Sequence, residues 1–173
     1  ALHLEISPSA RLFLRPILIF SQAIPVFARA PLLTLWLGYG MISKVTMAVL
    51  IIYFPVTSAL HDGLVNTPAG YLHLSSVMGA SKLKTLFLIK FPAAMPSLLS
   101  GIRLSAVYAP IGATIGEWVG SSQGLGYLML LANGRVKTDL MFAALFTLGA
   151  LSMGLYGLVS LFIRRYFARF QAN

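Results

Sequence analysis

The chain has 173 residues, of which 58% are hydrophobic and only 10% are charged. Soluble domains carry about a quarter charged residues, so this composition predicts an integral membrane protein. Lys and Arg number 13 against 4 Asp and Glu, but they lie between apolar runs, where anionic lipid and the positive-inside rule explain them without nucleic acid. The chain has no cysteine, which excludes disulfides and thiolate metal sites, and it has no GxxxxGK[ST] loop, so another chain would have to bind any ATP that drives it.

The first apolar stretch, "PILIFSQAIPVFARAPLLTLWLGYG", begins at Pro16 and contains Pro25, Arg29 and Pro31. Proline inside a helix removes a hydrogen bond and kinks or breaks the helix. Backbone freed in this way is tolerated at membrane depth only against protein or a water-filled cavity. The stretch is therefore predicted to be a broken or bent span that packs inside the protein.

Three further spans are predicted, each long enough to cross a hydrocarbon core of ~30 Å at about 1.5 Å per residue. They are Met41–Leu60, with Pro55 near its end, Ala93–Gly116, and Leu140–Ile163.

Charge fixes the expected orientation of these spans. Asp139 precedes the last span, whereas Arg164 and Arg165 follow it, which predicts a cytoplasmic C-terminus. Alternation of the spans then places the loop of residues 61–92 in the cytoplasm, and we expect a multi-pass membrane protein.

The loop of residues 61–92 predicts a helix–turn–helix. Thr67 can cap a first helix, with Pro68 in its first turn, and Gly79 can end that helix in a left-handed conformation. Ser81 can start a second helix, which Pro92 is expected to end. The small residues at the bend would let the surface of another protein approach closely.

This loop resembles a known signature. In "GASKLKTLFLIKFP", nine residues separate Gly79 from Ile89, and one residue then precedes Phe91-Pro92. The spacing is similar to the EAA signature of ABC importer permeases, although His73, Leu74 and Ser75 stand in place of Glu-Ala-Ala and Phe91 in place of Leu. The resemblance implies that an ATP-binding cassette subunit grips the loop through these residues: His73, Leu74, Ser75, Gly79, Ala80, Ser81, Lys82, Ile89 and Pro92. For the lysines, the ordinary basic character of cytoplasmic loops is an equally simple explanation.

Other stretches extend the resemblance over the chain from Arg15 onward. "SQAIPVFARAPLLTLWLGYG" and "KVTMAVLIIYFPV" are similar to permeases of the nitrate/sulfonate/taurine type. "PIGATIGEWVGSSQGLGYLML" and "TDLMFAAL" most resemble permeases for hydroxymethylpyrimidine, a thiamine precursor. The implied solute is that pyrimidine or, failing it, a sulfonate, taurine or nitrate.

The resemblance also implies an architecture and partners. The expected fold is an all-α transmembrane bundle of the type I ABC importer permease kind, with residues 1–173 as one permease domain from which upstream spans are missing. The resemblance also implies a location in the bacterial inner membrane. The expected partners are an ATPase subunit that binds ATP and Mg, a second permease copy in a homodimer, a periplasmic or lipid-anchored solute-binding protein, and membrane lipid. No cofactor is expected in this chain, nor an enzymatic activity of its own.

Several side chains could line a solute pathway. The polar, proline and aromatic residues suited to a flat aromatic solute are Gln22, Pro25, Tyr53, Phe54 and Tyr108. Ordinary helix packing is the more frequent reason for such rings. Arg29 lies inside the broken span. Glu117 lies at the expected outer boundary of the span Ala93–Gly116, where interfacial anchoring or a contact with a helix N-terminus are the alternatives.

Two other classes of membrane protein fit the sequence less well. An ion-coupled secondary transporter also uses broken helices, but it would need a carboxylate or ion site in mid-span, and the predicted spans hold no acid there. A membrane-embedded enzyme would need a nucleophile, an acid–base pair or a metal cluster, and no such group converges in the sequence.

Overall fold

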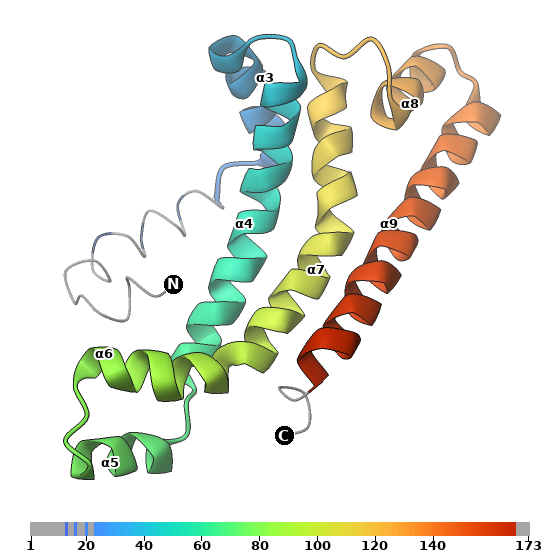
Figure 1. The fold of residues 1–173 in the computed structure, drawn as a ribbon. Helices are drawn as coiled ribbons and strands as arrows, with labels where there is room; N and C mark the ends of the chain where they lie inside the picture. The colour runs from blue at the N-terminus through green and yellow to red at the C-terminus, as the bar shows by residue number, and fades with distance from the viewer. Residues whose placement is uncertain (1–12, 14–15, 17–19, 21–22, 169–173) are drawn as a thin grey trace.

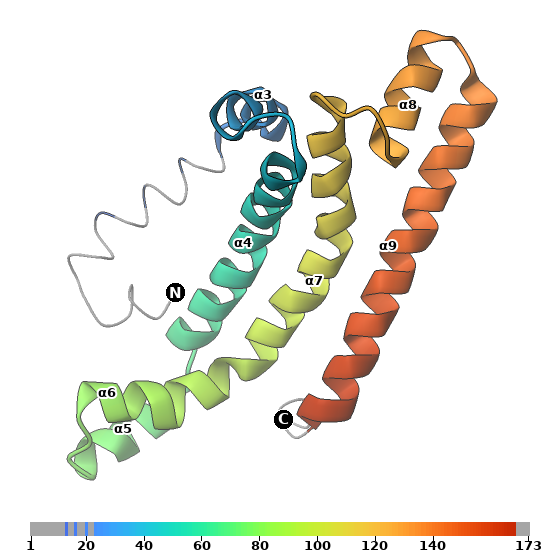
Figure 2. The same ribbon diagram turned by 45° about the horizontal axis from the view of Figure 1, so that its top comes forward.

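The computed structural model describes residues 13, 16, 20 and 23–168. Over residues 26–167 the regular elements are all helical: α3 Val26–Leu37, α4 Met41–Val65, α5 Ala69–Val77, α6 Lys82–Thr85, the π-helix η1 Leu86–Lys90, α7 Phe91–Trp118, α8 Leu125–Gly134 and α9 Thr138–Phe167. In Figures 1 and 2, α4, α7 and α9 lie side by side, with α7 in the middle. The short helices α5 and α6 lie at one end of this layer, and α3 and α8 lie at the other.

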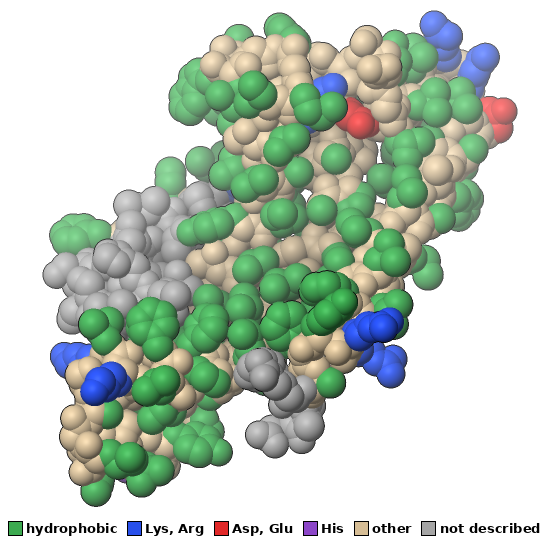
Figure 3. Space-filling model, in the orientation of Figure 1, with side chains coloured by type: hydrophobic (Ala, Val, Ile, Leu, Met, Phe, Trp, Pro, Cys, Tyr) green, Lys and Arg blue, Asp and Glu red, His purple; other side chains and the backbone are tan. Residues whose placement is uncertain are grey.

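Among the described residues, three helices are long and apolar enough to cross a membrane: Met41–Val65, Lys82–Trp118 and Thr138–Phe167. They contain the three uninterrupted spans predicted from the sequence. In the space-filling view, hydrophobic side chains cover much of the middle of the visible face, and most Lys and Arg side chains lie near the two ends (Figure 3). The C-terminal end of α9 lies at the same end as α5 and α6, as the predicted alternation requires.

The helices α4 and α7 pack through small residues. A Cβ atom added to Gly101 of α7 would lie 2.7 Å from the Cβ of Ala59, and one added to Gly112 would lie 2.9 Å from the Cα of Ala48. At the α5 end of the same interface, a Cβ on Gly63 of α4 would lie 2.9 Å from the Cβ of Ala94. Such close approach of backbones is typical of helix pairs in membranes, where van der Waals packing drives association.

Pro55 lies inside α4 and does not end it. The helix continues through this proline to Val65. Proline disrupts the hydrogen bonds of the preceding turn, and neighbouring Ser or Thr side chains can satisfy the freed carbonyls. The hydroxyl of Ser105 on α7 lies 3.2 Å from the carbonyl oxygen of Ile52 and 2.9 Å from that of Gly101, so it can donate to either.

The break predicted in the first stretch falls at Ile24–Pro25, which precedes α3. The second proline, Pro31, lies inside α3 without ending it. The helix buries Ala30 and Thr34, whereas Leu35 and Trp36 are 75% and 81% exposed. Within this chain α3 therefore covers the ends of α4 and α7, and the predicted burial of the whole segment is not seen.

Candidate functional site

The turn at Gly79 has the geometry predicted for it. At the end of α5, the N–H of Gly79 donates to the carbonyl of Ser76 and the N–H of Ala80 to the carbonyl of Ser75, each at 3.0 Å. This pair of bonds is a Schellman motif, whose penultimate residue must be left-handed. Gly79 has φ +66°, and a side chain added there would meet nothing within 4 Å. Glycine therefore closes the turn and leaves its outer surface open.

Thr67 does not cap α5, contrary to the sequence prediction. Its Oγ1 donates instead to the carbonyl of Leu64, at 3.0 Å, in the last turn of α4. The residue that precedes α5 is Pro68, whose side chain makes no capping hydrogen bond. A short connection explains the difference, because the last carbonyls of α4 lie within reach of the Thr67 hydroxyl.

The second helix begins as predicted. The backbone N–H of Lys84 donates to Oγ of Ser81 at 3.4 Å, so Ser81 is the N-cap of α6. The hydroxyl of Thr85 on α6 also donates to that of Ser75 on α5, at 3.4 Å. This contact ties the two arms of the helix–turn–helix to each other.

Pro92 does not end the second helix, contrary to the sequence prediction. The residues from Lys82 to Trp118 form one helical segment of 37 residues. Within it, η1 has the wider π-type turn, in which the N–H of Phe91 donates to the carbonyl of Leu86. A π-turn changes the hydrogen-bond register just before Pro92, where a donor is missing in any case. The chain bends between α6 and α7 but keeps its helical hydrogen bonding (Figures 1 and 2).

A small apolar cluster holds this bend against α4. Leu86 of η1, Leu64 of α4 and Ala94 of α7 are buried together, and Leu60 packs against them. Around the cluster, the surface of α5, α6 and η1 stays exposed and apolar. Its exposed large side chains are Tyr71, Leu74, Val77, Met78, Leu83, Phe87 and Leu88.

Most residues predicted to contact an ATPase are accessible. His73, Leu74, Gly79, Ser81, Lys82 and Pro92 are exposed, and Ala80 and Ile89 are half-buried. Ser75 is buried, because it takes part in the Gly79 turn and in the contact with Thr85. Ser75 is therefore placed to shape the surface rather than to lie on it.

At the opposite end, Glu117 holds the beginning of α8. The N–H of Gly126, in the first turn of α8, donates to Oε2 of Glu117 at 2.7 Å. Gly124 precedes the helix with φ +119°, and a Cβ atom there would overlap the Glu117 carboxylate. Of the alternatives left open by the sequence, the contact with a helix N-terminus is confirmed. In the same loop, Nζ of Lys44 on α4 donates to Oγ of Ser121 at 2.8 Å.

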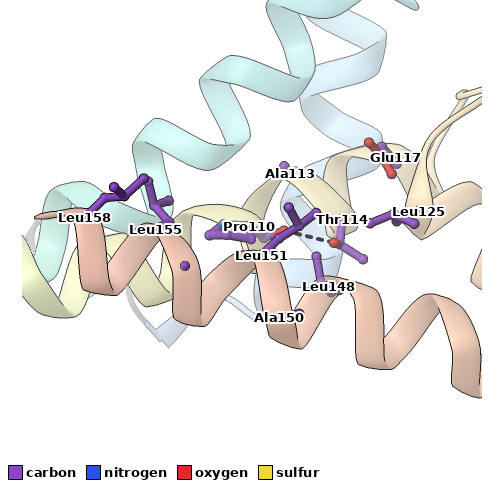
Figure 4. Close-up of a pocket in the computed structure, with 11 residues that line it drawn as sticks. Pro110, Ala113, Thr114, Glu117, Leu125, Leu148, Ala150, Leu151, Leu155 and Leu158 are labelled. Atoms are coloured by element: carbon purple, nitrogen blue, oxygen red, sulfur yellow. Dashed lines mark hydrogen bonds between the residues drawn. The ribbon is translucent and has the colours of Figure 1, made fainter.

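A groove of about 550 Å³ runs between α7 and α9 and reaches α8. On α7 it is lined by Pro110, Ala113, Thr114 and Glu117, and on α8 by Leu125. Its α9 wall consists of Leu148, Ala150, Leu151, Gly154, Leu155 and Leu158. Figure 4 shows Glu117 and Leu125 near one end and Leu158 at the other, with the Thr114 hydroxyl bonded to the carbonyl of Pro110. A second, apolar groove of about 480 Å³ continues between the same helices, past Leu99 and Phe162.

The predicted pathway residues that the structure describes do not all line the larger groove. Glu117 lines the larger groove, but Tyr53, Phe54 and Tyr108 are not among its lining residues. Pro25 precedes α3, and the guanidinium of Arg29 donates to the carbonyl of Ile24 at 2.7 Å, across the break in the chain. Gln22 lies outside the described residues.

Arg103 is a further candidate, in the middle part of α7. Its side chain is half-buried, and its buried Nε makes no hydrogen bond with the described part of the chain. Ionisable side chains at this depth in a membrane are functional candidates by default. The described residues contain no group of three or more His, Asp or Glu side chains that could hold a metal ion.

Comparison with known proteins decides the family. Residues 2–172 match the family described as the binding-protein-dependent transport system inner membrane component. The chain belongs to this family. The predicted resemblance to ABC permeases and the all-α fold are thereby confirmed. Membership makes the chain a membrane component of a transport system rather than an enzyme, with no cofactor of its own.

Three relatives show which transporters the chain resembles. A "Probable ABC transporter permease protein" of Haemophilus influenzae is 54% identical over 96% of this chain and 68% of the relative. A formylaminopyrimidine transport permease protein, ThiX, of Halalkalibacterium halodurans is 40% identical over 80% of this chain and 55% of the relative. A riboflavin transport system permease protein, RibX, of Chloroflexus aurantiacus is 38% identical over 92% and 59%. The chain thus spans between about half and two thirds of the length of these relatives.

Proposed function

We propose that the chain forms part of the solute pathway of an ATP-driven importer and receives the movement of a separate ATPase through α5 and α6. The observation that carries this proposal is the uninterrupted helical segment Lys82–Trp118. It joins an exposed apolar surface at one end of the molecule directly to a membrane span. A force applied to α6 therefore acts on α7 without an intervening flexible loop.

We assign a different proposed partner to each end of the molecule. The ATPase, which binds ATP and Mg, docks at the α5–α6 end, where the residues of the EAA-like signature lie. That end faces the cytoplasm in this proposal, because exposed Lys82 and Lys84 lie there together with Arg164 and Arg165 of α9. A solute-binding protein delivers solute at the α8 end, and a second permease copy completes the pathway within the lipid.

The proposed solute is a small nitrogen heteroaromatic molecule, with a thiamine-precursor pyrimidine such as hydroxymethylpyrimidine as the first candidate. Two relatives, at 40% and 38% identity, are named for the transport of formylaminopyrimidine and riboflavin, which are both nitrogen heterocycles. Flat rings of this kind stack on aromatic side chains. Tyr53 and Tyr108 are both exposed in this chain and are available for such contacts from the chain or from a second copy.

The proposal is tested by Gly79→Asp in the transporter assembled with its ATPase and reconstituted in vesicles. A Cβ atom at Gly79 meets nothing within 4 Å, and although the φ of +66° strains any side chain, Asp tolerates the left-handed region better than most residues. We therefore expect the variant to fold and insert, which its amount in the membrane fraction checks. The added carboxylate lies on the proposed docking surface. We expect ATP-driven uptake to fall by about tenfold or more, the effect of losing ~1.4 kcal/mol of contact energy.

The matched control is Gly134→Asp, which places the same side chain at the α8 end, where it also meets nothing within 4 Å. Because the solute-binding protein is proposed to dock at that end, the readout of this control is the amount of ATPase subunit that co-purifies with the permease, which this variant should leave unchanged. Normal uptake by the Gly79→Asp transporter would contradict the assignment of α5 and α6 as the docking surface.

A further inference from the structure

The helical segment Lys82–Trp118 reaches from the proposed docking surface to the opposite end of the molecule. Its 37 residues correspond to about 55 Å of helix at 1.5 Å per residue, including the bend at η1. Glu117 lies in the last turn of this segment, one residue before its end. A displacement of the α6 end would be passed on to the element that is joined to the Glu117 end.

The contacts of Glu117 join the beginning of α8 to this end. The carboxylate accepts the N–H of Gly126 at 2.7 Å, and the positive end of the α8 dipole strengthens a bond to a charged acceptor. A Cβ atom on Gly126 would lie 2.5 Å from the carbonyl oxygen of Thr114, so the start of α8 lies directly against α7. Together with Gly124, these contacts leave no space between the Glu117 carboxylate and the turn that enters α8.

The beginning of α8 also borders the groove. Leu125, its first residue, lines the groove together with Glu117 and Pro110 of α7, opposite Leu148 and Leu151 of α9. Because α8 also packs against α9, the width of the groove at this end depends on whether α8 keeps its position on α7 or on α9 when the helices shift. If α8 follows α7, displacement of α7 changes that width.

We propose that Glu117 is a positioning residue that makes α8 follow α7, so that movement delivered to α6 opens or narrows the α8 end of the groove. This inference rests on the proposed function, because the movement comes from the ATPase. Glu117 acts through Gly126 and need not touch the solute. This role requires an acceptor oxygen at the position of Oε2, within hydrogen-bond distance of the Gly126 N–H. A contact that only stabilised the fold would not depend on that atom in this way.

The test measures the distance between α8 and α9 in the reconstituted transporter. The chain has no cysteine, so spin labels can be placed at Leu130→Cys on α8 and Met153→Cys on α9, which are 49% and 77% exposed. The distance distribution is recorded without nucleotide and with MgATP plus vanadate. In the otherwise unchanged protein we expect two different distances in the two conditions.

Three variants of Glu117 separate positioning from stability. Glu117→Gln keeps an acceptor oxygen at the same reach and should keep the nucleotide-dependent change. Glu117→Ala removes the acceptor, and Glu117→Asp keeps the charge but shortens its reach by one methylene. In both we expect a broad distance distribution that no longer responds to nucleotide, and roughly 10- to 100-fold less uptake per ATP hydrolysed, the factor expected for losing a hydrogen bond to a charged group. Ser121→Ala, which removes the contact with Lys44 in the same loop, should keep the response.

The outcomes separate this inference from the proposed function. A normal nucleotide response in Glu117→Asp or Glu117→Ala would overturn the role of Glu117. ATP-driven uptake with a nucleotide-insensitive distance in the unchanged transporter would also overturn it, while leaving the proposed function intact. A transporter that shows no ATP-driven uptake at all would overturn the proposed function and this inference together.

Discussion

The two helix pairs that α7 forms differ in how closely they pack. Against α4, glycines bring the two backbones into contact, and a Cβ atom at Gly101 would lie 2.7 Å from Ala59. Against α9, the same helix leaves open grooves of about 550 and 480 Å³. In the most apolar part of α9 only 6% of the residues are buried within this chain, compared with 22% in the corresponding part of the segment Lys82–Trp118.

Small residues lie at a close helix contact in one of these pairs and line an open groove in the other. Ala150 and Gly154 of α9 form a small-xxx-small pair, which predicts close helix packing. Both residues line the groove, and a Cβ atom at Gly154 would meet nothing within 4 Å. Within this chain, α4 and α7 therefore form the closely packed pair, and the contact between α7 and α9 is the more open one.

The largest expected effect comes from a leucine placed in each of the two regions. Gly101→Leu inserts a side chain where only a hydrogen fits, and we expect it to destabilise the α4–α7 pair by about 3 kcal/mol or more. Gly157→Leu on α9 is the matched control, because a Cβ atom there meets nothing within 4 Å. The measurement is resistance of the purified protein to unfolding by detergent or heat. Equal stability of the two variants would contradict the contrast between the pairs.

A smaller effect is expected from a hydroxyl in each region. The hydroxyl of Ser105 can donate to the carbonyl of Ile52 on α4, whereas that of Ser152 on α9 donates to Leu148 of its own helix, at 2.9 Å. Ser105→Ala should cost about 1 kcal/mol, because a carbonyl in the turn before Pro55 loses a donor from α7. Ser152→Ala should lie within about 0.5 kcal/mol of the unchanged protein. A larger loss for Ser152→Ala than for Ser105→Ala would contradict the stabilising role given to the hydrogen bond from Ser105 to the carbonyl of Ile52.

Apolar length and turn chemistry were sufficient to predict much of the fold. The three uninterrupted spans follow from hydropathy, and the turn at Gly79 and the cap at Ser81 follow from residues with strong local preferences. The wrong predictions concern Thr67 and Pro92, where a local rule met a neighbouring element. Thr67 bonds back to α4, and the π-turn of η1 carries the helix through Pro92.

The candidate sites were predictable to different degrees. The exposed helix–turn–helix could be located from a spacing of residues within one segment. The contact of Glu117 with Gly126 joins residues nine apart through a loop, so the sequence could suggest a helix N-terminus as one alternative without selecting it. The pathway residues depend on how separate helices face each other, which residue type alone does not reveal, and the structure leaves Tyr53 and Tyr108 outside the groove.

The central claim is that α5 and α6 form a rigid docking surface on the cytoplasmic side, to which an ATPase subunit binds. Ala80→Cys tests it most directly, because the chain has no other cysteine and this residue lies at the bend between α5 and α6. The account predicts that a membrane-impermeant maleimide does not label Ala80→Cys in intact cells but does label it in inside-out vesicles, and that a short crosslinker joins it to the ATPase. Labelling from outside intact cells, or the absence of any crosslink to a nucleotide-hydrolysing subunit in the active transporter, would contradict the account.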